Sequence, residues 1–252
     1  DTLEDLQQVC AVLKENGYTP FMLAFQEQWV PQLMTALTIG GKVSGEAADW
    51  LDKMYADEGS YAEISEIFDV IDVIMANGTE RAMEEGSEAG SADFANGKAA
   101  MYVQGTWASG TIMTTNPDMK LGVFPLPING NKDCTRVNLS TSTTLAVYPE
   151  SENLELALKF ANYVLDEDSS ALFQACSFNP LASCHNYESA SWVAEASEYV
   201  AAGRAYQDLV LPSAVTDEQG KLLQEYYVGS VTKEDIIKTL DEAFQNANKM
   251  NQ

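Results

Sequence analysis

The apolar residues of this chain recur at spacings of three and four over long stretches, and this spacing predicts amphipathic helices. The first helix is predicted to begin at Thr2, which pairs with Asp5 as a capping box, and to end at Gly17. Its apolar face consists of Leu3, Leu6, Val9, Cys10 and Leu13. Further helices are predicted over residues 31–41, 46–55, 61–76, 105–113, 152–165, from there to about 175, 188–202 and 217–228. A last helix is capped by Thr232 together with Asp235.

Short apolar runs between these helices predict strands. The runs cover residues 21–25, 99–103 and 121–124, and residues 137–147 are rich in β-branched side chains and predict extended chain. The small, polar and acidic stretch 77–91 is predicted to be a surface loop that has room for one turn of helix. In the helix over 152–165, four residues are expected to point inward: Leu154, Leu158, Ala161 and Leu165. Strands that alternate with helices indicate a helix-rich α/β fold.

The charge of the chain excludes one class of partner. The 252 residues include 14 Lys and Arg against 38 Asp and Glu, so the net charge is 14 − 38 = −24 with the histidine neutral. Phosphate backbones and anionic membranes are repelled by such a surface, and nucleic acid is therefore not expected as a partner. Apolar residues make up 46% of the chain, which is enough for a sizeable core, yet no run is long enough to span a membrane. The start at Asp1 shows no secretory leader, so an export signal is expected to be removed or to lie outside these residues.

The cysteines and the single histidine carry no metal site. The four cysteines form no CxxC pair, and a structural zinc site needs four closely spaced Cys or His ligands, so neither a metal nor a cofactor is expected. Cys10 is predicted to be a small buried hydrophobe. Cys176 and Cys184 flank a loop and can form a disulfide, which the sequence permits without requiring it.

No arrangement of residues indicates catalysis. His185 is the only candidate base for a serine or cysteine triad, no GxSxG motif accompanies it, and it is predicted to be a surface histidine in a loop. A glycosidase needs two facing carboxylates, but with 38 acidic residues a plausible pair carries no information. No phosphate-binding glycine motif follows a strand. The chain is therefore not expected to be an enzyme, and a glycosidase remains the least favoured alternative.

The most informative stretch runs from Asp93 to Trp107. A predicted strand ends there, a helix begins at Gly105, and Trp107 lies in the first helical turn. The carboxyl end of a strand is where α/β folds bind ligands. A tryptophan offers a flat apolar face and an N–H donor, which suit the apolar C–H face and polar rim of a sugar. The alternative is a tryptophan that packs in the core.

These residues carry a resemblance to a known family. Phe94-x-x-Gly97-Lys98-x-Ala100-Met101 followed by Gly105-x-Trp107 resembles the signature of the extracellular solute-binding proteins of family 1, the sugar-binding receptors of ABC importers. Segments 2–6 with 17–20, 121–127, 155–160 and 229–235 are similar to later parts of the family, in the family's order. The resemblance implies an α/β fold of the periplasmic-binding-protein-like type II, without the amino-terminal segment of the first lobe. It assigns 1–139 to the second lobe, 140–210 to the segment that crosses back to the first lobe, and 211–252 to helices that return to the second.

The resemblance also implies a function and a set of ligand-binding residues. We expect a receptor, monomeric and extracytoplasmic (a cell-surface lipoprotein or periplasmic), that binds a carbohydrate, in particular an oligosaccharide, between two lobes. The transmembrane subunits of an ABC permease are its expected partner. The candidate ligand-binding residues are Trp107, Trp29, Glu27, Gln26, Asn138, Asn179 and Asp217. Trp107 is expected to stack on a sugar ring and Glu27 to accept hydroxyl hydrogen bonds, while a simple helix cap explains Asp217 equally well. Because an acid together with two tryptophans also suits a cation, a polyamine or an osmolyte remains an alternative ligand.

Overall fold

The capping box at the amino end forms as predicted and starts the first helix. In the computed structural model, Asp5 N–H donates to Thr2 Oγ1 at 3.2 Å, and Thr2 N–H donates to Asp5 Oδ2 at 2.9 Å. The structure describes residues 1–139, 144–175, 185, 187–188 and 190–250. The α-helices within these ranges are α1 (Leu3–Glu15), α2 (Trp29–Glu46), α3 (Trp50–Tyr55), α4 (Ile67–Ala76), α5 (Ser87–Ala95), α6 (Ser109–Thr115), α7 (Leu154–Tyr163), α8 (Ser170–Ala175), α9 (Ser191–Ala201), α10 (Ser213–Tyr227) and α11 (Lys233–Met250). Short 3-10 helices lie at η1 (Tyr61–Ile64), η2 (Ala82–Glu84), η3 (Thr106–Ala108), η4 (Lys132–Cys134) and η5 (Glu167–Ser169).

The described strands form two small parallel sheets. In the first sheet, β1 (Phe21–Met22) pairs with β2 (Met101–Tyr102). In the second sheet, β3 (Val137–Leu139) pairs with β4 (Ala205–Gln207). The two strands that flank residues 140–204 in the sequence are therefore neighbours in space. Parallel strands joined through helices are the signature of an α/β fold, and the prediction of a helix-rich α/β class is confirmed.

The segment after α4 is less exposed than its composition predicts. It runs alongside β1: Thr79 N–H donates to Phe21 O at 2.9 Å, and Phe25 N–H donates to Ala82 O at 2.7 Å. Ala82 is fully buried, and α5 already begins at Ser87. The prediction of a surface loop over 77–91 is therefore wrong for this part, because the loop supplies the hydrogen-bond partners that the short strand β1 needs along its edge.

Helix α2 runs through the glycines that were predicted to end it. A Cβ at Gly40 would lie 2.2 Å from Tyr206 Cε2, and a Cβ at Gly41 would lie 2.7 Å from Ile128 Cγ1. Gly45 would in the same way meet Cys134 Sγ at 2.6 Å. These glycines let β4 and η4 approach the helix backbone closely, so their role is packing and the predicted stop at residue 41 is wrong.

The main core lies where α1–α4, α10 and α11 meet around β1. Its largest fully buried side chains include Trp50, Tyr61, Phe25 and Phe244. The predicted helix over 61–76 is divided into η1 and α4, and its apolar face is buried as expected. In α1, by contrast, Val9 is exposed although Leu6 and Cys10 are buried. No helix in the described ranges is long and apolar enough to cross a membrane.

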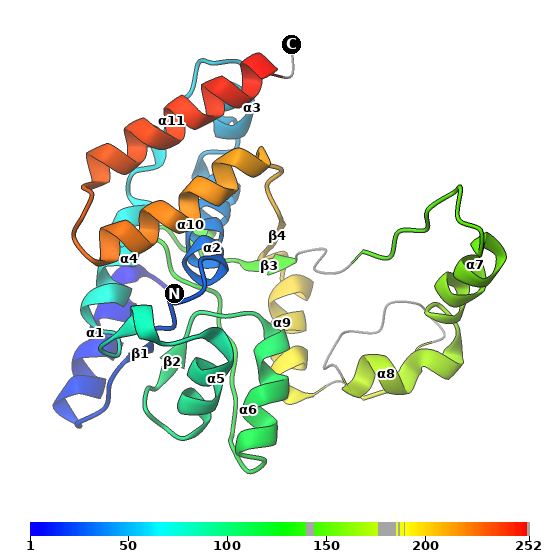
Figure 1. Ribbon diagram of the computed structural model, residues 1–252. Helices are drawn as coiled ribbons and strands as arrows, with labels where there is room; N and C mark the ends of the chain where they lie inside the picture. Colours follow the sequence, from blue (N-terminus) through cyan, green and yellow to red (C-terminus); the bar gives the residue numbers. More distant parts are fainter. Residues whose placement is uncertain (140–143, 176–184, 186, 189, 251–252) are drawn as a thin grey trace.

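The predicted strand over 121–124 does not form. The N–H of Val123 donates to the Glu195 carboxylate of α9 at 2.7 Å instead of to a neighbouring strand. Helix α9 thereby packs against the body of the molecule, as Figure 1 shows.

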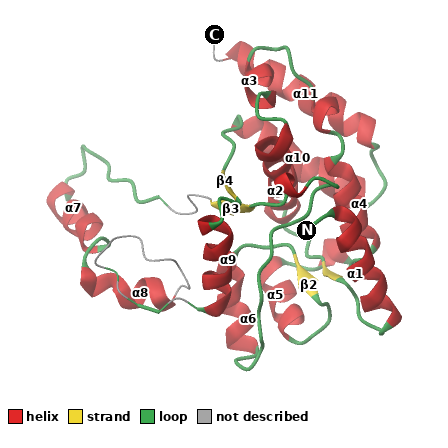
Figure 2. Ribbon diagram, turned by 180° about the vertical axis from the view of Figure 1, so that it is seen from behind, coloured by secondary structure: helices red, strands yellow, loops and turns green. Residues whose placement is uncertain are grey.

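Helices α7 and α8 stand apart from the other elements in both views (Figures 1 and 2). The prediction that α7 packs inward is wrong for this chain: α7 has no buried residue, and Leu158 and Leu165 are 48% and 52% exposed. His185, predicted to lie on the surface, is instead buried beside Phe173, with its Nε2 3.0 Å from Ser169 Oγ. The Cys176–Cys184 pair lies outside the described residues.

Candidate functional site

The carboxyl ends of β1 and β2 lead into the two segments that carry the predicted tryptophans. Parallel pairing of Met22 with Tyr102 places both ends at the same edge of the sheet. The chain continues from β1 to Trp29, the first residue of α2, and from β2 to Trp107 in η3. Both tryptophans keep a large exposed surface, 39% for Trp29 and 42% for Trp107. The alternative for Trp107, a tryptophan packed in the core, is therefore wrong, and Trp29 is not a core residue either.

Gly105 has a steric reason to precede Trp107. The Trp107 ring folds back over the Gly105 backbone, where an added Cβ would lie 2.1 Å from ring atom Cζ3. The N–H of Gly105 donates to the side chain of Gln104 at 3.1 Å, which fixes the start of the turn. Glycine at position 105 therefore leaves the space in which the indole lies over the backbone.

The loop that carries Gln26 to Trp29 is fastened by α10. Gln224 Nε2 donates to Phe25 O at 2.6 Å, and Gln28 Nε2 donates to Asp217 O at 2.6 Å. A Cβ at Gly220 would lie 2.6 Å from Gln28 O, so the helix and the loop are in close contact. Sequence reasoning missed these positioning residues. The glycine inside the predicted helix over 217–228 was the available signal, because a helical glycine often marks a close approach.

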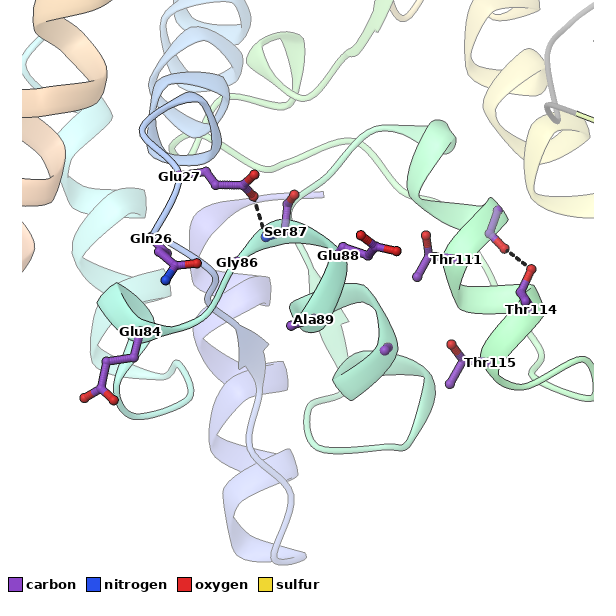
Figure 3. A pocket seen from close by; sticks show the side chains of 12 residues that line it. Gln26, Glu27, Glu84, Gly86, Ser87, Glu88, Ala89, Thr111, Thr114 and Thr115 are labelled. Carbon is purple, nitrogen blue, oxygen red and sulfur yellow. Dashed lines mark hydrogen bonds between the residues drawn. The ribbon is translucent and has the colours of Figure 1, made fainter.

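Glu27 is held as an ionised hydrogen-bond acceptor at the start of α5. Its Oε2 accepts the N–H of Ser87 at 2.7 Å (Figure 3). Hydrogen bonds from Ser87, first from its side chain and then from its backbone, keep the pKa of Glu27 below its ordinary value, and the Trp29 side chain adds a smaller effect. An acid at a helix amino terminus is also favoured by the helix dipole.

A groove of about 850 Å³ extends from this loop between α5 and α6 (Figure 3). Its lining combines acids, hydroxyls, an amide and small residues, namely Gln26, Glu27, Glu84, Gly86, Ser87, Glu88, Ala89, Ala92, Gly110, Thr111, Thr114 and Thr115. No Lys or Arg is among these lining residues of the described chain. Such a lining can hold a polyhydroxylated solute by many hydrogen bonds.

The two walls of the groove are fixed by a second, smaller core. Its buried members come from β1, α5 and α6 and the turns beside them: Met22, Phe94, Ala95, Ala99, Ala108 and Ile112. Asn116 Nδ2, just after α6, donates to the carbonyl oxygen of Ala95 at 3.0 Å and ties the end of α6 to the end of α5. Sequence reasoning missed the groove because it places 77–91 in a loop. The spacing of Thr111, Thr114 and Thr115 on one helical face was the signal that could have indicated it.

The remaining predicted residues lie elsewhere. Asn138 is in the second sheet, where its Nδ2 donates to Asp208 Oδ1 at 2.7 Å and links the segments of β3 and β4. Asp217 lies inside α10 instead of before it, with an exposed side chain, so it does not cap this helix. Asn179 lies outside the described residues. Within the described part of the chain, no group of three or more His, Cys, Asp or Glu side chains can hold a metal ion.

Comparisons with known proteins indicate a family and a fold for this chain. The family described as bacterial extracellular solute-binding protein matches residues 1–171. No curated protein matches this sequence. Among solved structures, a sugar transporter from Bacillus licheniformis in complex with stachyose is 19% identical with a TM-score of 0.81, and the match covers 98% of this chain and 66% of that one.

Two further solved structures show the same fold. A chitin oligosaccharide binding protein is 19% identical with a TM-score of 0.77, covering 100% of this chain and 65% of its own. The solute-binding protein RafE in complex with raffinose is 17% identical with a TM-score of 0.70, covering 98% and 66%. At these identities the likeness concerns the fold, which is the periplasmic-binding-protein-like α/β fold predicted from the sequence. The chain spans slightly less than two thirds of the length of these proteins.

Proposed function

Because the chain belongs to the family of bacterial extracellular solute-binding proteins, we propose that it binds an oligosaccharide outside the cytoplasm and delivers it to an ABC import permease. The family and the structures of the same fold are solute-binding proteins and not enzymes. The ligand is held at the carboxyl ends of β1 and β2. Trp107 and Trp29 stack on sugar rings, while Glu27 and Gln26 accept and donate hydrogen bonds at the sugar rim.

One observation carries this proposal. Two exposed tryptophans and a carboxylate held by Ser87 follow the carboxyl ends of two paired parallel strands. Large exposed aromatic side chains are costly in water, and their placement beside polar hydrogen-bonding groups is what carbohydrate recognition requires. The sugars in complex with two proteins of the same fold, stachyose and raffinose, support the class of ligand.

We also propose that the cleft has two lobes. Residues 1–139 and 211–252 form the second lobe, and residues 140–210 cross to the first lobe through β3 and return through β4. The exposed apolar residues of α7 and α8, including Leu158, Phe160 and Leu172, support a further packing partner for these helices. Asn138 then lies at the crossing, Asp217 at the rim, and Asn179 in the crossing segment. The protein acts as a monomer, and its charge of −24 disfavours nucleic acid as a partner.

The test is binding of saccharides to Trp107→Ala. Calorimetry with stachyose, raffinose, chitotetraose and cellotetraose should find at least one ligand for the unchanged chain. Loss of a stacking tryptophan should cost about 2–4 kcal/mol, a loss of affinity of about 30- to 700-fold. Tyr18→Ala is the matched control, because Tyr18 is an exposed aromatic residue at the opposite, amino end of β1. Equal affinities of the two variants, or no heat with any saccharide, would reject the proposal.

The competing ligand is a cation, which an ionised Glu27 together with two exposed tryptophans favours. Spermidine and glycine betaine belong in the same panel for this reason. If either of them binds and no saccharide does, the ligand belongs to the cationic class and not to the sugars. Spermidine binding to a chain of this charge would also weaken steeply with added salt, whereas the binding of a neutral sugar would not.

A further inference from the structure

We propose that the groove between α5 and α6 holds the sugar units that extend beyond the ring on Trp107, and that it admits neutral or amino sugars and rejects acidic ones. This inference rests on the proposed function and adds the length and the charge class of the ligand.

The position of the groove makes it a continuation of the site. It starts at Gln26 and Glu27 and is bounded on its other side by α6, whose first residue, Ser109, is two positions after Trp107. Its volume of about 850 Å³ lies in the upper part of the range of roughly 300–1,000 Å³ found for small-molecule sites. A single sugar ring leaves much of this space empty, so the groove fits a ligand of several units.

The wall formed by α6 has the chemistry of a sugar contact. Thr111, Thr114 and Thr115 occupy one helical face and all line the groove. The hydroxyl of Thr114 donates to Gly110 O at 2.8 Å, which leaves its oxygen as an acceptor. The hydroxyls of Thr111 and Thr115 form no hydrogen bond with any described residue, and Glu88 points into the same space (Figure 3). Sugar hydroxyls can donate to and accept from this set.

The charge of the lining sets the class of sugar. Three carboxylates line the groove, from Glu27, Glu84 and Glu88, and no cationic side chain is among the lining residues described. Arg81 forms an ion pair with Glu84 and neutralises the charge of this one acid. The carboxylate of a uronate in the groove would face these acids without a cationic partner. Such like-charge repulsion lowers the affinity for an acidic ligand relative to a neutral one. A neutral sugar meets no such repulsion, and an amino sugar is attracted.

The length of the ligand is tested by filling the groove. Gly110 lines it, and a Cβ there meets no atom within 4 Å, so Gly110→Phe should fold and occupy the space. Gly130→Phe is the matched control, since a Cβ at Gly130 also meets nothing and this residue does not line the groove. Calorimetry would compare stachyose, chitotetraose and cellotetraose with their disaccharides melibiose, chitobiose and cellobiose. We expect Gly110→Phe to weaken the tightest tetrasaccharide at least tenfold, and its disaccharide much less.

The charge class is tested on the same protein. The tightest of these tetrasaccharides, oxidised at C6 to the uronate, should bind at least tenfold more weakly than its neutral form. In Glu88→Gln, the ratio of the two dissociation constants should fall at least threefold. Equal effects of Gly110→Phe and Gly130→Phe, or a uronate that binds as tightly as the neutral sugar, would overturn the inference while the proposed function stands. If no saccharide binds the unchanged chain, the proposed function fails and this inference fails with it.

Discussion

The close packing of α2 against β4 makes Gly40→Ala a sharp test of the fold. The added Cβ would lie 2.2 Å from Cε2, 2.7 Å from Cζ and 2.8 Å from the hydroxyl oxygen of Tyr206. The ring cannot swing away at low cost, because Tyr206 is buried and its hydroxyl donates to Leu37 O at 3.2 Å. The substitution must therefore displace either the helix or the strand.

The magnitude follows from a comparison with Gly110→Ala. A glycine in an ordinary helical conformation that is replaced by alanine gains about 0.4–1 kcal/mol from the restricted unfolded chain, at both positions. At Gly110 nothing lies within 4 Å, so this gain should be seen in full. At Gly40 the overlap adds an overpacking cost of about 1–3 kcal/mol. The difference between the two variants isolates this cost.

The assay is urea denaturation followed by circular dichroism, with the free energy of unfolding extrapolated to water. We expect Gly40→Ala to be less stable than Gly110→Ala by about 1–3 kcal/mol. The double variant Gly40→Ala with Tyr206→Ala should be more stable than the sum of the single changes predicts, since the ring that clashes is gone. If Gly40→Ala is as stable as Gly110→Ala, the packing role assigned to the glycines of α2 is wrong.

Two further predictions concern titration and reactivity. Hydrogen bonds from Asn131, and next from Lys42, lower the pKa of Glu46 to about 2 from an ordinary value of 4.5. Between pH 4.5 and 2 the unfolded chain therefore binds more protons than the folded one, and the free energy of unfolding should fall as the pH drops. The urea midpoint of Glu46→Gln should fall less over this range than that of the unchanged chain. Equal dependence of the two midpoints on pH would contradict the assignment. Burial raises the pKa of the Cys134 thiol to about 11, so iodoacetamide at pH 8 should label its peptide only in denaturant, as peptide mass spectrometry can show; labelling of the native protein would contradict the burial.

Local signals in the sequence predicted the elements whose ends are set by local chemistry. The capping boxes of Thr2 with Asp5 and Thr232 with Asp235 both form, because their hydrogen bonds span only three residues. Glycines were misread where their role is not local. In α2, Gly40 makes room for Tyr206, more than 160 residues later, and a propensity rule that assigns glycine to helix ends does not register such a partner.

Burial that depends on distant partners could not be read from periodicity. The apolar spacing of α7 correctly predicts a helix. It does not show which segment covers the apolar face, and in the described chain this face is exposed. The run over 121–124 has the composition of a strand, yet its Val123 N–H is satisfied by Glu195. For the candidate site, the sequence predicted the two tryptophan segments from their place after strands, and it missed the groove because the start of α5 lies in a stretch of small and acidic residues.

The positioning of the site depends on segments far from its motif. The strands β1 and β2 have only two residues each, too few to fix the loops that follow them. The loop from Gln26 to Trp29 is instead held by Gln224 of α10, and the wall that follows Trp107 is tied to α5 through Asn116. A change in α10 that leaves every proposed ligand contact intact should therefore still weaken binding, because the ligand would then have to order the loop itself. The Gly-x-Trp motif supplies the Trp107 surface, while contacts from α10 hold the loop that carries Trp29.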